Sequence, residues 1–334
     1  MAPGMEPEDE HIKPLETIVI VPITPLKTKK EEHLLVHMVA GSTAGLFSKT
    51  ILQPLDLVKT RLQVQMVETA APSASAVNLS KNALPYKGVL DAFRSVVRTE
   101  GLSALYTGLA PNLVGSGVSW GCYFFSYNMA KREYAEFTGI QGKLGPLAHL
   151  QCAGFAGVAT CLITNPIWMV KTRVQIQRKG GEYNGAMDCL RSIVRNEGVF
   201  ALYRGIGPAL TLVSNGAIQF MSYEYLRNAL CVHVGEANLS SHHFLAMGAI
   251  AKAFSSTLTY PLQVMKSRLY QRSSTNNQRP LYTGMVDVCT KTFKAQGVRG
   301  FYSGLVPQLM KTVPSSALTF FAYEHVVRLF SLIE

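Results

Sequence analysis

Three segments of this chain repeat one another at intervals of about 100 residues, and this repetition limits the fold more than any other feature. One shared block is QPLDLVKTRLQ from Gln53, NPIWMVKTRVQ from Asn165 and YPLQVMKSRLY from Tyr260. A second block reads YKGVLDAF, YNGAMDCL and YTGMVDVC, and a third reads FFSYNMAKR, FMSYEYLRN and FFAYEHVVR. We therefore predict three similar units, over residues 33–137, 145–233 and 241–332. A disordered tail, acidic and rich in proline, is predicted over residues 1–30.

Each unit holds two apolar segments of about 20 residues, which is long enough for a helix to cross roughly 30 Å of hydrocarbon. The leading segments cover residues 34–53, 147–165 and 243–260, and the trailing segments cover residues 109–130, 206–226 and 305–326. Between them lies a stretch with helical periodicity and charges on one face, as expected of a helix on a membrane surface. The predicted fold is an all-α membrane protein with six transmembrane helices, pseudo-threefold symmetry and one short surface helix per repeat.

Composition agrees with helices that are apolar on only one side. Apolar residues make up 48% of the chain and charged residues 16%, yet the mean hydropathy is only +0.14. Helices that line an aqueous cavity would give such a value. The net charge of +11 favours an anionic partner. Nucleic acid is not expected as that partner, because the sequence has no zinc-finger spacing, aromatic RNA-binding run or basic low-complexity tail.

The first block follows the pattern Pro-x-x-x-x-Lys-x-Arg three times, from Pro54, Pro166 and Pro261, and its first copy also has the acid of the fuller pattern Pro-x-[Asp/Glu]-x-x-Lys-x-Arg. In this it resembles the mitochondrial carrier family over residues 33–332. The resemblance implies a monomeric transporter working by alternating access, not an enzyme, with no cofactor and no metal. It implies the mitochondrial inner membrane, with plastid or peroxisomal membranes as alternatives, and lipid partners such as cardiolipin. The rival hypothesis is a non-transporting receptor or scaffold with the same fold.

The resemblance also implies that the three prolines kink the leading helices, so that the charged residues after them close a gate on the matrix side. This sequence departs from the family pattern, because only the first repeat has the acid, Asp56. We expect Asp56 to pair with Lys171, Gln263 to bond Lys59, and Lys266 to face the ring of Trp168. The predicted matrix gate is Asp56, Lys59, Gln63, Trp168, Lys171, Gln175, Gln263 and Lys266.

The third block implies a second gate, on the cytoplasmic side, at the ends of the trailing helices. Its pattern, an aromatic residue and an acid followed by a base, is complete only in the second repeat. Pairs of Glu224 with Lys131 and of Glu324 with Arg227 are expected. The predicted cytoplasmic gate is Tyr127, Lys131, Tyr223, Glu224, Arg227, Tyr323 and Glu324.

Polar side chains recur every four residues along the trailing segments, so one face of these helices should meet water or a solute. The alternative is that they are satisfied by hydrogen bonds between helices. Lysines within membrane spans are costly and usually functional. Three of them, with no intramembrane acid expected to match them, predict an anionic solute. The predicted substrate site is Lys49, Ser119, Trp120, Thr211, Asn215, Lys252, Lys311 and Ser315.

The choice of substrate can be narrowed further only by the resemblance of single motifs to branches of the family. A tryptophan after the second proline, Trp168, resembles the branch that carries folate, flavin, pyridine dinucleotides and pyrimidine nucleotides. SWGCYFFSYN from Ser119 and TYPLQVMKSRLY from Thr259 are similar to the FAD and folate carriers, whereas Lys49 resembles the adenine nucleotide carriers. We expect FAD or folate, with NAD, a pyrimidine nucleotide, CoA or an adenine nucleotide as alternatives.

Overall fold

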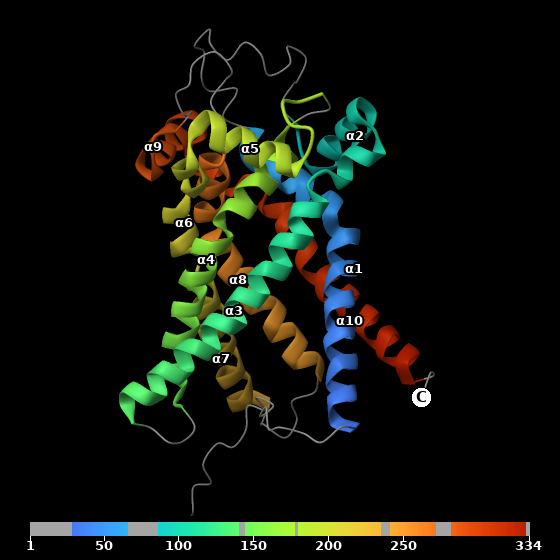
Figure 1. Ribbon diagram of the computed structural model, residues 1–334, viewed down its shortest axis with the longest axis vertical. Helices are drawn as coiled ribbons and strands as arrows, with labels where there is room; N and C mark the ends of the chain where they lie inside the picture. Colours follow the sequence, from blue (N-terminus) through green and yellow to red (C-terminus); the bar gives the residue numbers. More distant parts are fainter. Residues whose placement is uncertain are drawn as a thin grey trace, which may run out of the picture.

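The computed structural model describes residues 29–65, 86–139, 144–177, 180–234, 241–271 and 282–331. Within these ranges the chain is helical and has no strand (Figure 1). Residues 1–28, where most of the predicted disordered tail falls, lie outside the described part, and a helix begins at Lys29.

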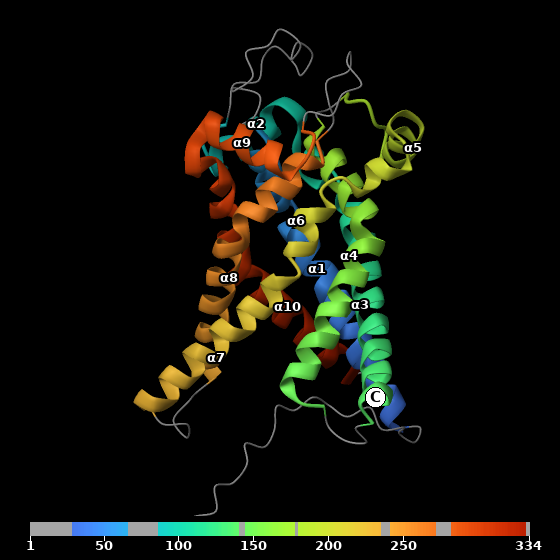
Figure 2. The same cartoon turned by 90° about the vertical axis from the view of Figure 1, so that its left-hand side faces the viewer.

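Long helices from the three repeats form the body of the molecule. They are α1 (Lys29–Gln65), α3 (Leu109–Thr138), α4 (Pro146–Ile176), α7 (Ser214–Val234), α8 (Ser241–Leu269) and α10 (Leu305–Ser331), with a short α6 (Ile206–Thr211) leading into α7. They pack in three pairs, α1 with α10, α3 with α4, and α7 with α8. The pairs converge at one end and splay apart at the other (Figures 1 and 2). We call these the closed end and the open end.

The predicted surface helices lie around the closed end (Figure 1). They are α2 (Val89–Glu100), α5 (Ala186–Glu197) and α9 (Met285–Gln296), each followed by a short 3₁₀ turn: η1 (Leu102–Tyr106), η2 (Val199–Tyr203) and η4 (Gly297–Tyr302). An aspartate in the first turn of each accepts a hydrogen bond from the backbone N–H just before the helix. These bonds are Lys87 to Asp91 at 2.8 Å, Asn184 to Asp188 at 2.9 Å, and Thr283 to Asp287 at 3.0 Å. The carboxylate thus occupies a place where an unpaired N–H and the helix dipole favour negative charge.

A glycine with positive φ precedes each trailing helix and fixes how closely the repeats approach. Gly108, Gly205 and Gly304 have φ values of 78°, 80° and 84°. A Cβ at Gly108 would lie 2.7 Å from the side chain of Gln175, and a Cβ at Gly205 would lie 2.9 Å from the ring of Tyr270. Glycine is therefore required for both its backbone conformation and its lack of a side chain.

The leading helices continue through Pro54, Pro166 and Pro261, so they are longer than the predicted spans. In every repeat, the residue before the proline donates to the backbone carbonyl of a residue shortly ahead of the trailing helix. These bonds are Gln53 Nε2 to Thr107 O at 3.0 Å, Asn165 Nδ2 to Leu202 O at 2.7 Å, and Tyr260 Oη to Ser303 O at 3.1 Å. The proline motif therefore fastens the leading helix of each repeat to the start of its own trailing helix.

The prediction of one unbroken trailing helix over residues 206–226 is wrong. The helix is interrupted at Leu212 and Val213, between α6 and α7. Two hydroxyls compete with the backbone there: Thr211 Oγ1 donates to Pro208 O at 3.0 Å, and Ser214 Oγ donates to Thr211 O at 2.7 Å. Such local bonds offer the chain an alternative to the regular helix.

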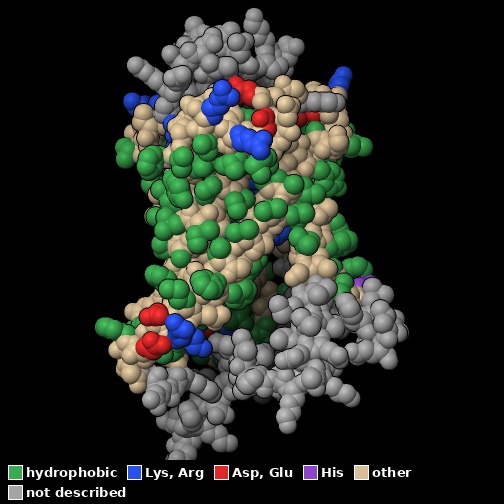
Figure 3. Space-filling view, in the orientation of Figure 1, with side chains coloured by type: hydrophobic (Ala, Val, Ile, Leu, Met, Phe, Trp, Pro, Cys, Tyr) green, Lys and Arg blue, Asp and Glu red, His purple; other side chains and the backbone are tan. Residues whose placement is uncertain are grey.

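The outer surface has a broad apolar band between charged ends (Figure 3). Large apolar side chains on it are exposed, such as Phe155, Phe254 and Leu258, each at 56%. Of the helices in the described ranges, Leu147–Ile176 alone has the length and mean hydropathy, 1.5, of a typical membrane span. The other long helices carry polar residues on their inner faces, which lowers their mean hydropathy. An apolar band of this kind is suited to contact with lipid chains.

Candidate functional site

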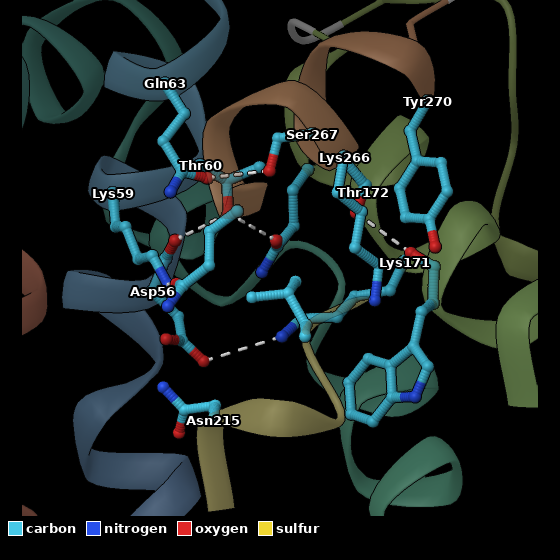
Figure 4. A pocket seen from close by; sticks show the side chains of 14 residues that line it. Asp56, Lys59, Thr60, Gln63, Lys171, Thr172, Asn215, Lys266, Ser267 and Tyr270 are labelled. Atoms are coloured by element: carbon cyan, nitrogen blue, oxygen red, sulfur yellow. Dashed lines mark hydrogen bonds and ion pairs between the residues drawn. The ribbon is translucent and has the colours of Figure 1, made fainter. Parts of the chain in front are cut away.

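A cavity of about 320 Å³ lies inside the closed end. Side chains from α1, α4 and α8 form most of its wall, and Leu212 and Asn215 complete it at the break between α6 and α7 (Figure 4). All eight residues predicted for the matrix gate line this cavity. The structure therefore brings this set together, as the repeat pattern predicted.

Asp56 is the single acid among the described residues that line the cavity, and two lysines contact it. Its carboxylate lies 3.6 Å from Lys171 Nζ, which confirms the expected pair, and 2.5 Å from Lys311 Nζ. The expectation that Lys311 has no matching acid is wrong. Since α10 packs along α1, the lysine on α10 reaches the aspartate on α1. One carboxylate thus connects helices from all three repeats.

The remaining lysines of the cavity have neutral partners. Lys59 Nζ donates to Gln263 Oε1 at 3.3 Å, as predicted. The predicted contact of Lys266 with Trp168 is wrong: Lys266 Nζ lies 5.6 Å from the centre of the Tyr270 ring, and the ring of Trp168 has Lys171 above it at 5.2 Å. In both contacts the ring lies three or four residues from the lysine in the sequence, within α4 for Trp168 and directly after α8 for Tyr270, where side chains are neighbours.

Gln63, Gln175 and Tyr270 occupy equivalent positions, and each bonds a neighbouring repeat. Ser267 Oγ donates to Gln63 Oε1 at 2.8 Å, and Thr60 Oγ1 donates to Gln175 Oε1 at 3.0 Å. Tyr270 Oη donates to Asn165 Oδ1 at 2.6 Å. These bonds join α1 to α8, α4 to α1 and α8 to α4, so they form a closed ring around the pseudo-threefold axis.

Three arginines that were not among the predicted site residues form a second ring next to the cavity. Each guanidinium donates to a backbone carbonyl of the next repeat: Arg61 to Gln175 at 3.1 Å, Arg173 to Tyr270 at 3.0 Å, and Arg268 to Gln63 at 3.2 Å. Their positions could have been found from the sequence, because each is the last residue of the repeated Pro-x-x-x-x-Lys-x-Arg motif.

The arginines also bind their own surface helices, but not in the same way. Arg61 forms a bidentate ion pair with Glu100 at 2.5 and 2.8 Å, and Arg173 pairs with Glu197. Arg268 is fully buried and instead bonds Thr292 Oγ1 at 2.5 Å and Gln296 Oε1 at 3.1 Å. Within the described ranges, no carboxylate pairs with Arg268, so the third repeat lacks the ion pair of the other two.

Gln296→Glu is expected to raise the free energy of unfolding by about 1 kcal/mol, because an ion pair would replace a hydrogen bond in which only Arg268 is charged. Thermal unfolding in detergent measures the change. Asn196→Asp, the same amide-to-carboxylate change on an exposed residue of α5, is the control and should have little effect. A lower midpoint for Gln296→Glu would mean that the neutral amide is the better partner of Arg268.

The residues predicted for the substrate site do not form one compact cluster. Of the eight, Asn215 lines the closed-end cavity, and Lys311 reaches it through Asp56. Others have partners within the bundle: Lys252 Nζ donates to Gln219 Oε1 at 3.0 Å, and Ser315 O accepts a bond from Ser48 Oγ at 3.2 Å. Lys49 is half-buried on α1, Ser119 bonds its own helix, Thr211 is exposed, and Trp120, 60% exposed, stacks on Phe124.

At the open end the expected ion pairs are not formed. Glu324 lies 3.9 Å from Arg328 on its own helix instead of pairing with Arg227, and Glu224 and Lys131, both described, do not pair with each other. Tyr127 donates to or accepts from His149 Nδ1 at 2.7 Å, which joins α3 to α4. Tyr223 is half-buried, and the side chain of Tyr323 lies outside the described residues. The splayed helices account for the absence of pairs, because the trailing helices stand apart here (Figure 2).

Comparison with known proteins agrees with this architecture. The sequence matches the mitochondrial carrier protein family over residues 30–137, 142–233 and 238–333. It is 42% identical to the chloroplastic folate transporter 1 of Arabidopsis thaliana, over 87% of this chain and 94% of the relative. It is 35% identical to the mitochondrial pyrimidine nucleotide transporter RIM2 of Saccharomyces cerevisiae, over 89% of this chain and 86% of the relative. It is 34% identical to the mitochondrial nicotinamide adenine dinucleotide transporter 2 of Arabidopsis thaliana, over 87% of this chain and 78% of the relative.

The three matches, one for each repeat, together with relatives at this level of identity, show that the chain belongs to the mitochondrial carrier family. The expected family and the all-α carrier fold are confirmed.

Proposed function

We propose that this protein transports a large anionic cofactor or nucleotide-like solute across an organelle membrane by alternating access, with folate as the first solute to test and FAD as the second. The observation that carries the proposal is the closed-end cavity, in which lysines outnumber the single acid. Ammonium groups that face an aqueous cavity attract carboxylates and phosphates.

The relatives support an anion of this class. The names of three of them give folate, pyrimidine nucleotides and nicotinamide adenine dinucleotide as solutes, and all of these carry carboxylate or phosphate groups. NAD, a pyrimidine nucleotide, CoA and an adenine nucleotide are therefore the alternatives. The relatives include both mitochondrial and chloroplastic carriers. We assign this chain to the mitochondrial inner membrane, as a monomer with cardiolipin among its lipid neighbours, and keep a plastid or peroxisomal membrane as the alternative.

In this proposal the cavity residues on α1, α4 and α8 act as the gate on the matrix side, because they close one end of the bundle while the other end is splayed. The predicted cytoplasmic gate, at the open end, would form its ion pairs in the opposite state. The polar residues between the two ends, among them Asn215, Lys252 and Lys311, would contact the solute on its way.

Uptake into liposomes tests the proposal. The purified full-length chain, reconstituted in liposomes, should take up one class of large anion faster than protein-free liposomes do. The panel contains folate, FAD, NAD, a pyrimidine nucleotide, CoA and ADP, with a cationic solute as the control. The initial rate should fall as the salt concentration rises, because ions screen solvated charges. Uptake of the cation alone would contradict the proposal, and no uptake of any solute by a folded protein would favour the receptor or scaffold hypothesis.

A further inference from the structure

The closed-end cavity contains more positive charge than its own acid can balance. Lys59, Lys171 and Lys266 line it, and Lys311 reaches the same Asp56. Four ammonium groups and one carboxylate leave a formal charge of +3. Like charges at such short range repel strongly when water is partly excluded.

The imbalance is concentrated on two of the lysines. Asp56 is engaged by Lys171 and Lys311, whereas Lys59 has the neutral amide of Gln263. Lys266 has the ring of Tyr270 and, in the described part of the chain, no hydrogen bond or ion pair. Both lysines are half-buried, and an ammonium group that is partly shielded from water and has no counterion is unfavourable. The acids that would serve as counterions are missing, because Trp168 and Gln263 occupy the positions that correspond to Asp56 in the other two repeats.

The polar groups around the cavity narrow the chemistry of a ligand. The hydroxyls of Thr60, Thr172 and Ser267 already donate to protein oxygens, and the side-chain amide of Asn215 donates to Ser255 O and Thr259 Oγ1. The donors left for a ligand are therefore the ammonium groups and an amide, Gln175 Nε2, which has no hydrogen-bond partner among the described residues. A ligand in this position needs acceptors and negative charge, which an oxyanion provides. At about 320 Å³, the cavity has the volume of roughly ten water molecules, so it can hold a phosphate or a pair of carboxylates.

We propose that the closed-end cavity is an oxyanion site, in which a phosphate group or a pair of carboxylates lies between Lys59 and Lys266 and supplies the negative charge that the second and third repeats lack. The anion would complete the polar ring by which α1, α4 and α8 meet. The group can come from free inorganic phosphate or from an anionic solute. In the latter case the inference rests on the proposed function, because the solute would itself hold the closed end together.

Thermal unfolding of the full-length chain in detergent tests the site without any need for transport. Inorganic phosphate replaces chloride at constant ionic strength, so that general screening stays the same. We expect the unfolding midpoint to rise with phosphate and to saturate, as for any ligand that binds the folded state. Gln263→Glu places a carboxylate where the amide oxygen now lies 3.3 Å from Lys59 Nζ. It should raise the midpoint in chloride and increase the half-saturating phosphate concentration by about tenfold.

Two further variants make the test specific. Lys266→Gln removes one cation without adding an acid, so it should also weaken the phosphate response by about tenfold without the rise in chloride. Asn196→Asp, on the exposed face of α5, should keep the response of the unmodified chain. No saturable response to phosphate, or the same half-saturating concentration in the unmodified chain, Gln263→Glu and Lys266→Gln, would overturn the proposal.

A competition experiment between phosphate and folate identifies the source of the anion. If the solute's own carboxylates occupy the site, phosphate should compete with folate in the same unfolding assay. If free phosphate is the ligand, the two stabilising effects should add. Failure of liposome uptake alone would contradict the proposed transport and leave this site standing, whereas uptake without a phosphate response would do the reverse.

Discussion

Asp56→Asn should lower the free energy of unfolding by about 3 kcal/mol and reduce uptake at least tenfold. The carboxylate pairs with lysines of α4 and α10, and its residue is only 9% exposed. Removing one partner of a buried ion pair typically costs 3–5 kcal/mol, because the remaining charge stays buried without compensation. We expect a loss of stability near the lower limit of this range, since Lys171 and Lys311 would still be in contact with the cavity. Thermal unfolding and initial uptake rates measure the two effects.

The control for this prediction is Glu136→Gln on α3. Glu136 lies 3.6 Å from Arg132 in an exposed pair, and such pairs contribute little, so its loss should change stability by less than about 0.5 kcal/mol. If Asp56→Asn unfolds at the same temperature as this control, the contacts of Asp56 do not stabilise the closed end.

Glu100→Gln should be at least as destabilising, by about 3–5 kcal/mol. Arg61 and Glu100 are 5% and 6% exposed, and their bidentate contact is the most buried ion pair among the described residues. The same guanidinium donates to the carbonyls of Gln175 and Gln177 at 3.1 Å, so it also connects the first repeat to the second. Chemical or thermal unfolding, with Glu133→Gln on the exposed part of α3 as the matched control, measures the loss.

The third repeat contains a natural counterpart of this substitution. There, glutamine is the natural partner of the arginine, and Thr292 adds a short hydrogen bond. If Glu100→Gln costs no more than the exposed control, the arginine ring would depend on its backbone bonds alone. In that case Gln296→Glu should have no effect either.

The closed end could be predicted from the sequence because the repeat places equivalent residues on equivalent helix faces. Once Pro54, Pro166 and Pro261 are aligned, the residues that follow them must meet near the axis of a threefold bundle. For this reason the eight predicted gate residues share one cavity, and two expected contacts, Asp56 with Lys171 and Lys59 with Gln263, are present.

The partners of long side chains could not be predicted in the same way. Lys311 lies 255 residues from Asp56, and no periodicity relates a trailing helix to the leading helix beside it. The ring contacts of Lys171 and Lys266 were missed because the expected symmetric pairing did not include neighbours on the same helix. The break at Leu212 depends on hydroxyl bonds that compete locally with the helix, and hydropathy does not register them.

The open end was harder to predict for another reason. A carrier sequence encodes two closed arrangements, one at each end, and a single conformation holds only one of them. Because the helices are splayed at this end, Glu324 pairs with Arg328, a base on its own helix. We propose that the pairs expected between trailing helices form in the opposite arrangement.

The interruption between α6 and α7 has a mechanical consequence. An unbroken helix behaves as a stiff rod, whereas two residues outside the helical pattern act as a joint. The break is held in place by packing against α4. Val213 lies so close to Gly157 that a Cβ added to Gly157 would be 2.5 Å from Val213 Cγ1. We therefore expect α7 to tilt at this break while Leu212 stays in the cavity wall, whereas α3 has no such break and α10 continues through Pro314. The open end should close unequally, because among the described trailing helices only that of the second repeat is divided in two.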